Sequence, residues 1–140
     1  MKRIFLVFAL ALFSCVAFAG EQPDATEDFA NLIAQKKYNE AIDLSLGSSR
    51  WAGEKKEGLQ DFKNKLVNQI EFVGSYKYHE LIETQRVGKR FKRVSYLIGF
   101  ERQPIAFIFT LYKPDKEWVV NDISFNTDFN FNNGHLILGR

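Results

Sequence analysis

The sequence predicts an α+β domain in which two N-terminal helices pack on an antiparallel sheet of four or more strands. Up to Gly74, apolar residues recur every three or four positions, which is the spacing of amphipathic helices. After Gly74 they alternate with polar residues, which is typical of strands. Residues 20–140 are numerous enough to form one domain with its own hydrophobic core.

Residues 1–19 have the pattern of a cleavable secretory signal peptide. Lys2 and Arg3 precede an apolar run from Ile4 to Val16, and Ala17-Phe18-Ala19 supplies the small-x-small motif of a cleavage site. We therefore expect the protein to be exported, either to a periplasm or to the medium.

Cys15 offers an alternative to this cleavage. Leu12-Phe13-Ser14-Cys15 resembles a bacterial lipobox, in which the cysteine is lipidated and anchors the protein to a membrane. Phe13 is bulkier than that pattern prefers, and we expect a membrane contact only if Cys15 is lipidated. If cleavage follows Ala19 instead, the mature chain has no cysteine for a disulfide or a thiolate metal site.

The charge of the domain argues against some partners. Residues 20–140 carry 17 basic and 17 acidic residues. This balance does not favour nucleic acid or an anionic membrane as a general partner. Basic residues do crowd one predicted hairpin, where they either hold an acidic partner or protect an edge strand as solvated charges, and we adopt the second interpretation. They are Arg86, Lys89, Arg90, Lys92 and Arg93.

Two helical regions are expected before Gly74. The first begins at a capping box, Asp24 to Glu27, and runs to about Gly47. Its apolar stripe changes phase at Lys36-Lys37, so it is either one kinked helix or two short ones. The second carries a stripe from Leu59 to Val73 and ends at Gly74.

Four strands follow, joined by short turn-rich segments, so that neighbours run antiparallel as a meander. The predicted strands are Tyr76–Arg86, Phe91–Glu101, Ile105–Lys113 and Trp118–Asp128. The tail, residues 129–140, is expected either to add an edge strand or to be disordered.

Apolar pairing predicts the register of the last three strands. A turn at Arg102-Gln103 places Ile98 opposite Phe107, and a three-residue loop at 114–116 places Ile123 opposite the same phenylalanine. In this register the inner face is apolar except for Asn121.

The first hairpin has two possible registers. A turn at Gly88-Lys89 directs His79 and Leu81 inward. A change of one residue directs Glu80 and its neighbours, Tyr78 and Ile82, inward instead.

Three stretches carry a family resemblance: Lys37–Ala41, Gly74–Tyr76 and Leu111–Trp118. Together with the order of helices and strands, they resemble the cystatin-like, nuclear transport factor 2-like superfamily over Phe29–Asp128, and within it small exported bacterial members of unknown function. The resemblance implies a cone-like, curved sheet wrapped on helices, often with an internal pocket and often as a dimer. The superfamily includes enzymes and binding proteins, so the fold does not choose between them.

The candidate ligand site is the inner face of the sheet. A buried amide without partners is costly, so Asn121 either orients a ligand in a pocket or is turned outward by a β-bulge near Asn121-Asp122. We expect the pocket. Its expected ligand-binding residues are Tyr96, Phe107, Phe109, Asn121 and His79.

The function expected from these features is that of an exported, non-catalytic domain that binds a small ligand or a protein partner. No catalytic residue, metal site or cofactor is expected, because the two histidines are far apart in the chain and no cysteine accompanies them. The alternative is a small isomerase- or hydrolase-type enzyme that uses His79 or Glu80. Apolar residues on the outer face predict a homodimer. They are Leu97, Ile108, Tyr112 and Trp118.

Overall fold

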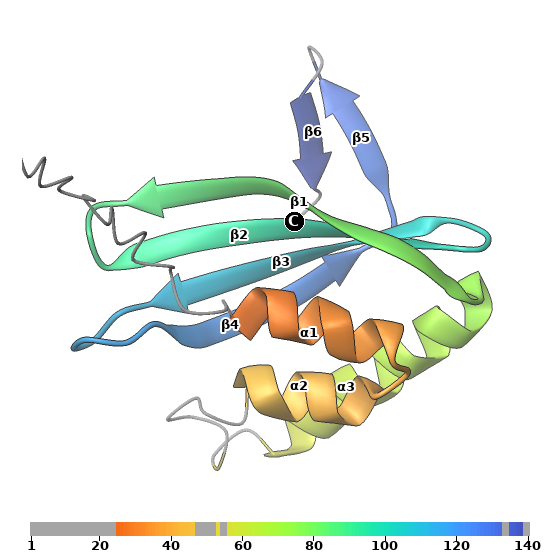
Figure 1. Cartoon of the computed structure of the whole chain (residues 1–140), viewed down its shortest axis with the longest axis horizontal. Coiled ribbons are helices and arrows are strands. Elements are labelled where there is room, and N and C mark those ends of the chain that lie inside the picture. The colour runs from red at the N-terminus through yellow and green to blue at the C-terminus, as the bar shows by residue number, and fades with distance from the viewer. Residues whose placement is uncertain (1–24, 47–52, 54–55, 133–134, 139–140) are drawn as a thin grey trace, which may run out of the picture.

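The computed structural model describes residues 25–46, 53, 56–132 and 135–138 (Figure 1). The predicted signal peptide, Cys15 and Asp24 lie outside these residues. Along the chain the elements are α1 (Ala25–Ala34), α2 (Tyr38–Leu46), α3 (Lys56–Val73), β1 (Tyr76–Val87), β2 (Phe91–Phe100), β3 (Pro104–Tyr112), β4 (Val119–Asn126), β5 (Phe129–Asn132) and β6 (His135–Leu138).

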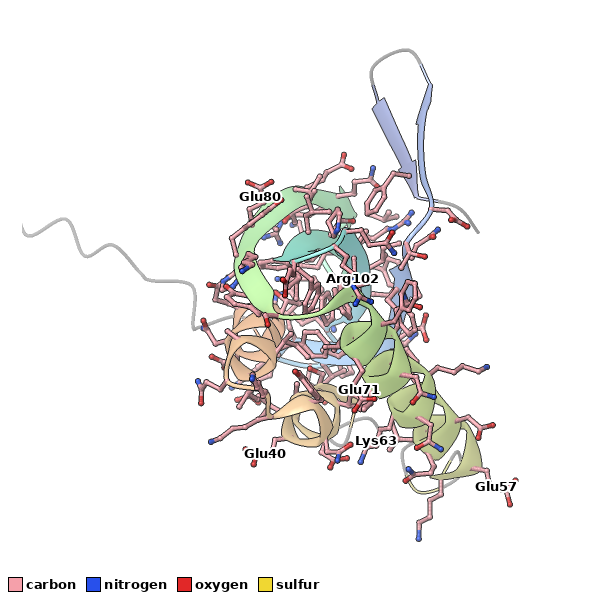
Figure 2. All side chains as sticks on the ribbon, turned by 90° about the vertical axis from the view of Figure 1, so that its right-hand side faces the viewer. Glu40, Glu57, Lys63, Glu71, Glu80 and Arg102 are labelled. Carbon is pink, nitrogen blue, oxygen red and sulfur yellow. The ribbon has the colours of Figure 1, made fainter. Side chains whose placement is uncertain are left out.

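The predicted α+β arrangement is confirmed. Strands β1 to β4 form one antiparallel sheet in sequence order, and the three helices pack on it. Figure 2, which looks along the strands, shows the sheet curving round strongly at β1 without closing. In the tail, β5 and β6 pair with each other as a separate hairpin and are not part of the main sheet, and the hairpin projects away from the helices in Figure 1.

The first helical region is two helices, and Lys36 separates them. This residue has a φ of 62°, in the left-handed region. The Lys37 amide donates to the Leu32 carbonyl at 2.9 Å and the Lys36 amide donates to the Ile33 carbonyl at 3.0 Å. These two bonds form a Schellman motif, which ends α1 and lets α2 start in a new direction. The change of phase in the sequence is therefore a true helix end.

Gly74 ends α3, as predicted. Its φ is 92°, and its amide donates to the Ile70 carbonyl at 3.0 Å. The Val73 carbonyl next to it accepts from the Arg102 amide at 2.9 Å, so the end of α3 is tied to the loop between β2 and β3.

The predicted register between β2 and β3 is wrong by two residues. Ile98 pairs with Ile105, not with Phe107, and the last pair is Gly99 with Pro104. The loop at 101–103 is longer than the expected two-residue turn because Arg102 bonds the end of α3 through both its amide and its side chain. A shift of two residues leaves every side chain on its predicted face, so the inner face is still apolar.

The predicted inward position of Asn121 is also wrong. Thr110 pairs with Asp122, while Leu111 pairs with Val120, so Asn121 is the extra residue of a β-bulge. Its side chain is exposed, and Val120 is buried in its place. The bulge that the sequence offered as the alternative is the one observed.

In the first hairpin His79 faces inward, opposite Ile98. Val87 pairs with Phe91, so the loop has one residue more than the predicted two-residue turn at Gly88-Lys89. Without any other change, this longer loop would direct Glu80 inward instead of His79. A one-residue irregularity between Leu81 and Glu83 reverses the effect. Glu80 is therefore exposed and points away from the sheet in Figure 2.

Gly74, just after α3, and Gly58, within it, give a matched test of the helix end. We expect Gly74→Ala to destabilise the protein by about 1–2 kcal/mol, because a side chain disfavours the left-handed conformation. The new Cβ would also lie 3.1 Å from the Glu101 Cβ. Gly58→Ala in the first turn has open space around it and should stabilise by about 0.5 kcal/mol. Urea denaturation measures the free energy of unfolding of both variants. If both substitutions stabilise the protein, or both destabilise it, this account of the helix end is contradicted.

Candidate functional site

Four polar side chains from α1, β1 and β2 meet at the inner face of the sheet, and we call them the Glu27 cluster. Tyr96 on β2 donates its hydroxyl proton to Glu27 Oε2 at 2.8 Å. His79 Nε2 lies 3.1 Å from Glu27 Oε1, and His79 Nδ1 lies 2.7 Å from the Tyr76 hydroxyl. A chain of hydrogen bonds thus runs from Tyr76 through His79 and Glu27 to Tyr96.

Packing of α1 places the carboxylate in this cluster. Phe29 is fully buried, with its ring centroid 5.1 Å from those of both Phe107 and Phe109. Glu27 lies two residues earlier, in the first turn, where negative charge suits the positive end of the helix dipole. Its position opposite His79 and Tyr96 follows from how the helix sits on the sheet.

The carboxylate determines one donor in this chain of hydrogen bonds. A carboxylate can only accept, so His79 Nε2 donates to Glu27, and in the neutral imidazole Nδ1 accepts from Tyr76. The hydrogen bond from Tyr96, followed by that from His79, lowers the pKa of Glu27 below its ordinary value. Burial, followed by the negative charge of Glu27, raises the pKa of the Tyr76 hydroxyl.

The directions of these shifts do not favour Glu27 or Tyr76 as a general acid or base at neutral pH. A general acid or base works best with a pKa near the operating pH, but the pKa of Glu27 moves down from the acidic side and that of Tyr76 moves up from the basic side. The His79 side chain is 17% exposed and Glu27 46% exposed, so the cluster borders solvent. Its evident effect is to hold α1 on the sheet.

The structure brings together four of the five predicted ligand-binding residues. His79 and Tyr96 are in the Glu27 cluster, and Phe107 and Phe109 lie beside it under Phe29. Both phenylalanines are fully buried, so a helix side chain occupies the part of the inner face that they line.

Asn121 is the exception, since it lies exposed at the bulge in β4. Glu80, the alternative acid–base candidate, is exposed and takes no part in the Glu27 cluster. The sequence argument missed Glu27 and Tyr76. The sequence places Glu27 in a capping box. The only sequence signal for its contact with the sheet is that His79, if directed inward, needs a hydrogen-bond partner.

The predicted outer face needs one correction. Trp118 packs against the inner core and not on the outer face. Ile108 on the outer face is buried within the single chain, whereas Tyr112 is exposed.

Neither metal ligands nor a membrane span are found in the described part of the chain. Within it, no three His, Cys, Asp or Glu side chains are grouped so that they could hold a metal ion. None of its helices combines the length and the apolar character needed to cross a membrane. No protein-family model matches the sequence, and no curated protein or solved structure matches it either. The site is therefore interpreted from its own geometry.

A pH titration tests the Glu27 cluster. Because the pKa of Glu27 is lowered in the folded state, its stabilising effect is complete above the ordinary value of 4.5 and is lost as the pH falls through the lower folded-state pKa. Glu27→Gln should cost about 1 kcal/mol at neutral pH, a modest effect because the carboxylate is half exposed. It should also flatten the loss of stability between about pH 5 and pH 3.

Glu80→Gln is the matched control for this titration, since it removes an exposed carboxylate outside the cluster. Thermal unfolding across the pH range should give the wild-type curve for this variant. Identical curves for wild type and Glu27→Gln would show that the cluster does not contribute to stability.

The bulge predicts opposite outcomes for two neighbouring residues. Asn121→Leu should change the free energy of unfolding by less than about 0.5 kcal/mol, because the side chain is exposed. Val120→Asn should cost about 2–3 kcal/mol, because it buries an amide in the core. Chemical denaturation measures both free energies of unfolding. A large change for Asn121→Leu with little change for Val120→Asn would support the predicted register, in which Asn121 faces inward.

Proposed function

We propose that this chain is an exported, non-catalytic module that binds an extended segment of a protein partner along the free edge of β1. The resemblance to the nuclear transport factor 2-like superfamily is compatible with this proposal, because that superfamily includes binding proteins as well as enzymes. One feature counts against the enzyme alternative: the Phe29 side chain occupies the inner face of the sheet.

The exposure of β1 carries the proposal. This strand has 12 residues and forms one edge of the main sheet, with β2 as its neighbour among the described residues. Every residue from 80 to 90 is exposed. Large apolar side chains are among them, including Leu81 at 54% and Val87 at 69% exposure.

An exposed edge strand is a template for strand addition. Main-chain hydrogen bonds supply affinity for an incoming peptide, and alternate side chains supply specificity. Natural proteins limit indiscriminate pairing at such edges with charges and bulges. β1 has both, in Lys77 and Arg86 and in the irregularities between Tyr76 and Tyr78 and between Leu81 and Glu83. These features favour a selected partner over uncontrolled aggregation.

Self-association is the second proposal for a partner. The sequence placed a homodimer contact on the outer face, but Ser95, Ala106 and Ile108 there are already buried within one chain. Less apolar surface is thus left on that face than the sequence implied. The β1 edge has more exposed apolar surface than the outer face. The experiment below can show whether a second copy of the chain binds there.

Site-specific photo-crosslinking tests strand addition. A photoreactive amino acid at Gln85 of the full-length protein in its native host should give a discrete adduct, which mass spectrometry identifies as a partner segment or a second copy. Ile82→Lys with Val87→Lys should remove that adduct without altering thermal stability, because both side chains are exposed. Leu44→Lys on α2, at a similarly exposed apolar residue, is the control and should leave the adduct unchanged. The proposal fails if position 85 gives no adduct, or if the β1 and α2 substitutions act alike.

A further inference from the structure

We propose that one end of the sheet docks on an anionic lipid surface, through a row of apolar side chains and the cations beside it. The row crosses all four strands of the main sheet, and we call it the end row. Val87 on β1 pairs with Phe91 on β2, Phe91 pairs with Tyr112 on β3, and Tyr112 pairs with Val119 on β4.

The end row lies on the outer face of the sheet, opposite the helices. Its members on β3 and β4 are next in sequence to Leu111 and Val120, which belong to the inner hydrophobic core, so alternation turns the end row outward. Directly paired residues share a face, and the members on β1 and β2 therefore point the same way. Val87 is 69% exposed, Phe91 39% and Tyr112 44%, while Val119 is half-buried.

Two joined turns present the end row at one end of the sheet. The β1–β2 turn and the β3–β4 connection lie at the left-hand end in Figure 1, beyond the first turn of α1. The Lys113 amide donates to the Arg90 carbonyl at 2.9 Å, and Arg90 Nη1 donates to the Pro114 carbonyl at 2.6 Å. Because these bonds tie the turns together, the four side chains are held as one surface.

Cations flank the end row on its β1–β2 side. Lys89 and Arg90 are in the turn, and Arg93 is the next outward residue of β2. All three are exposed, and the sequence contains no acidic residue at positions 84–100. The β3–β4 connection, residues 113–117, has two lysines and two carboxylates and adds no net charge. A local excess of positive charge therefore borders the exposed apolar side chains.

Area and charge together favour a lipid surface over a protein at this end. Four side chains supply far less than the roughly 800 Å² per partner of a stable protein interface. An isologous contact between two copies would also bring the cations of one turn near those of the other, which disfavours a dimer here.

A bilayer surface, in contrast, suits a small contact of this composition. Aromatic rings are accommodated singly at the level of the headgroups, and each basic residue near an anionic surface strengthens binding by about fivefold. The neutral charge of the domain argues against an anionic membrane as a general partner, but the fold places these cations beside exposed apolar side chains. The contact does not depend on lipidation of Cys15.

Vesicle flotation tests this contact, with full-length protein isolated from its native host. The wild type should float better with vesicles of phosphatidylglycerol and phosphatidylcholine than with phosphatidylcholine alone, and added salt should reduce the difference. Phe91→Ala with Tyr112→Ala should weaken binding to the anionic vesicles by about tenfold or more. Lys89→Gln with Arg93→Gln should do the same.

Each double variant has a matched control at exposed residues outside the end row. Phe72→Ala with Tyr78→Ala removes one phenylalanine and one tyrosine from α3 and from the other end of β1. Lys65→Gln with Lys77→Gln removes the same amount of charge. Both controls should float as the wild type does. All variants share one N-terminal segment, so its own affinity for lipid does not affect the comparison.

Three outcomes overturn the proposal. The wild type could bind both kinds of vesicle equally, or the end-row variants could float like their controls. The third outcome comes from light scattering: a dimer that Phe91→Ala with Tyr112→Ala dissociates, together with no flotation of the wild type, would assign the end row to a second copy of the chain.

Discussion

Phe29 is fully buried and places its ring 5.1 Å from the rings of Phe107 and Phe109. The inner face of a curved apolar sheet must be covered, and this contact fixes where α1 covers it. The position of α1 then brings Glu27 to His79 and Tyr96, across a separation of 52 and 69 residues along the chain. One hydrophobic contact therefore determines a polar network that no local pattern specifies.

Much of the fold could be predicted from periodicity and turn residues alone. The Lys36 helix end, the Gly74 stop and the order of the strands each have a local cause in the sequence. The register errors had a different origin. A tertiary bond from Arg102 to Val73 lengthened one loop, and a bulge at Asn121 displaced another strand. Alternation identifies which residues share a face, but tertiary contacts decide how far each strand slides.

In the candidate site, too, alternation predicts some of the residues and tertiary contacts place the others. Tyr96, Phe107 and Phe109 could be assigned to the inner face from alternation along their strands. His79 could not, because an irregularity between Leu81 and Glu83 decides which side of β1 faces inward. Glu27 could not, because its role depends on the placement of a helix against a sheet that comes later in the chain. Trp118 is a similar case: it lies just before β4, where the path of the connection from β3 decides which face it joins.

The burial of Phe29 also affects how the chain folds. Its ring partners on β3 lie nearly eighty residues further along the sequence. The ribosome therefore synthesises α1 long before the side chains that cover it. Such non-local contacts slow folding and leave apolar side chains exposed in the meantime. The hydrophobic core around Phe29 can therefore be completed only after β3 has been synthesised.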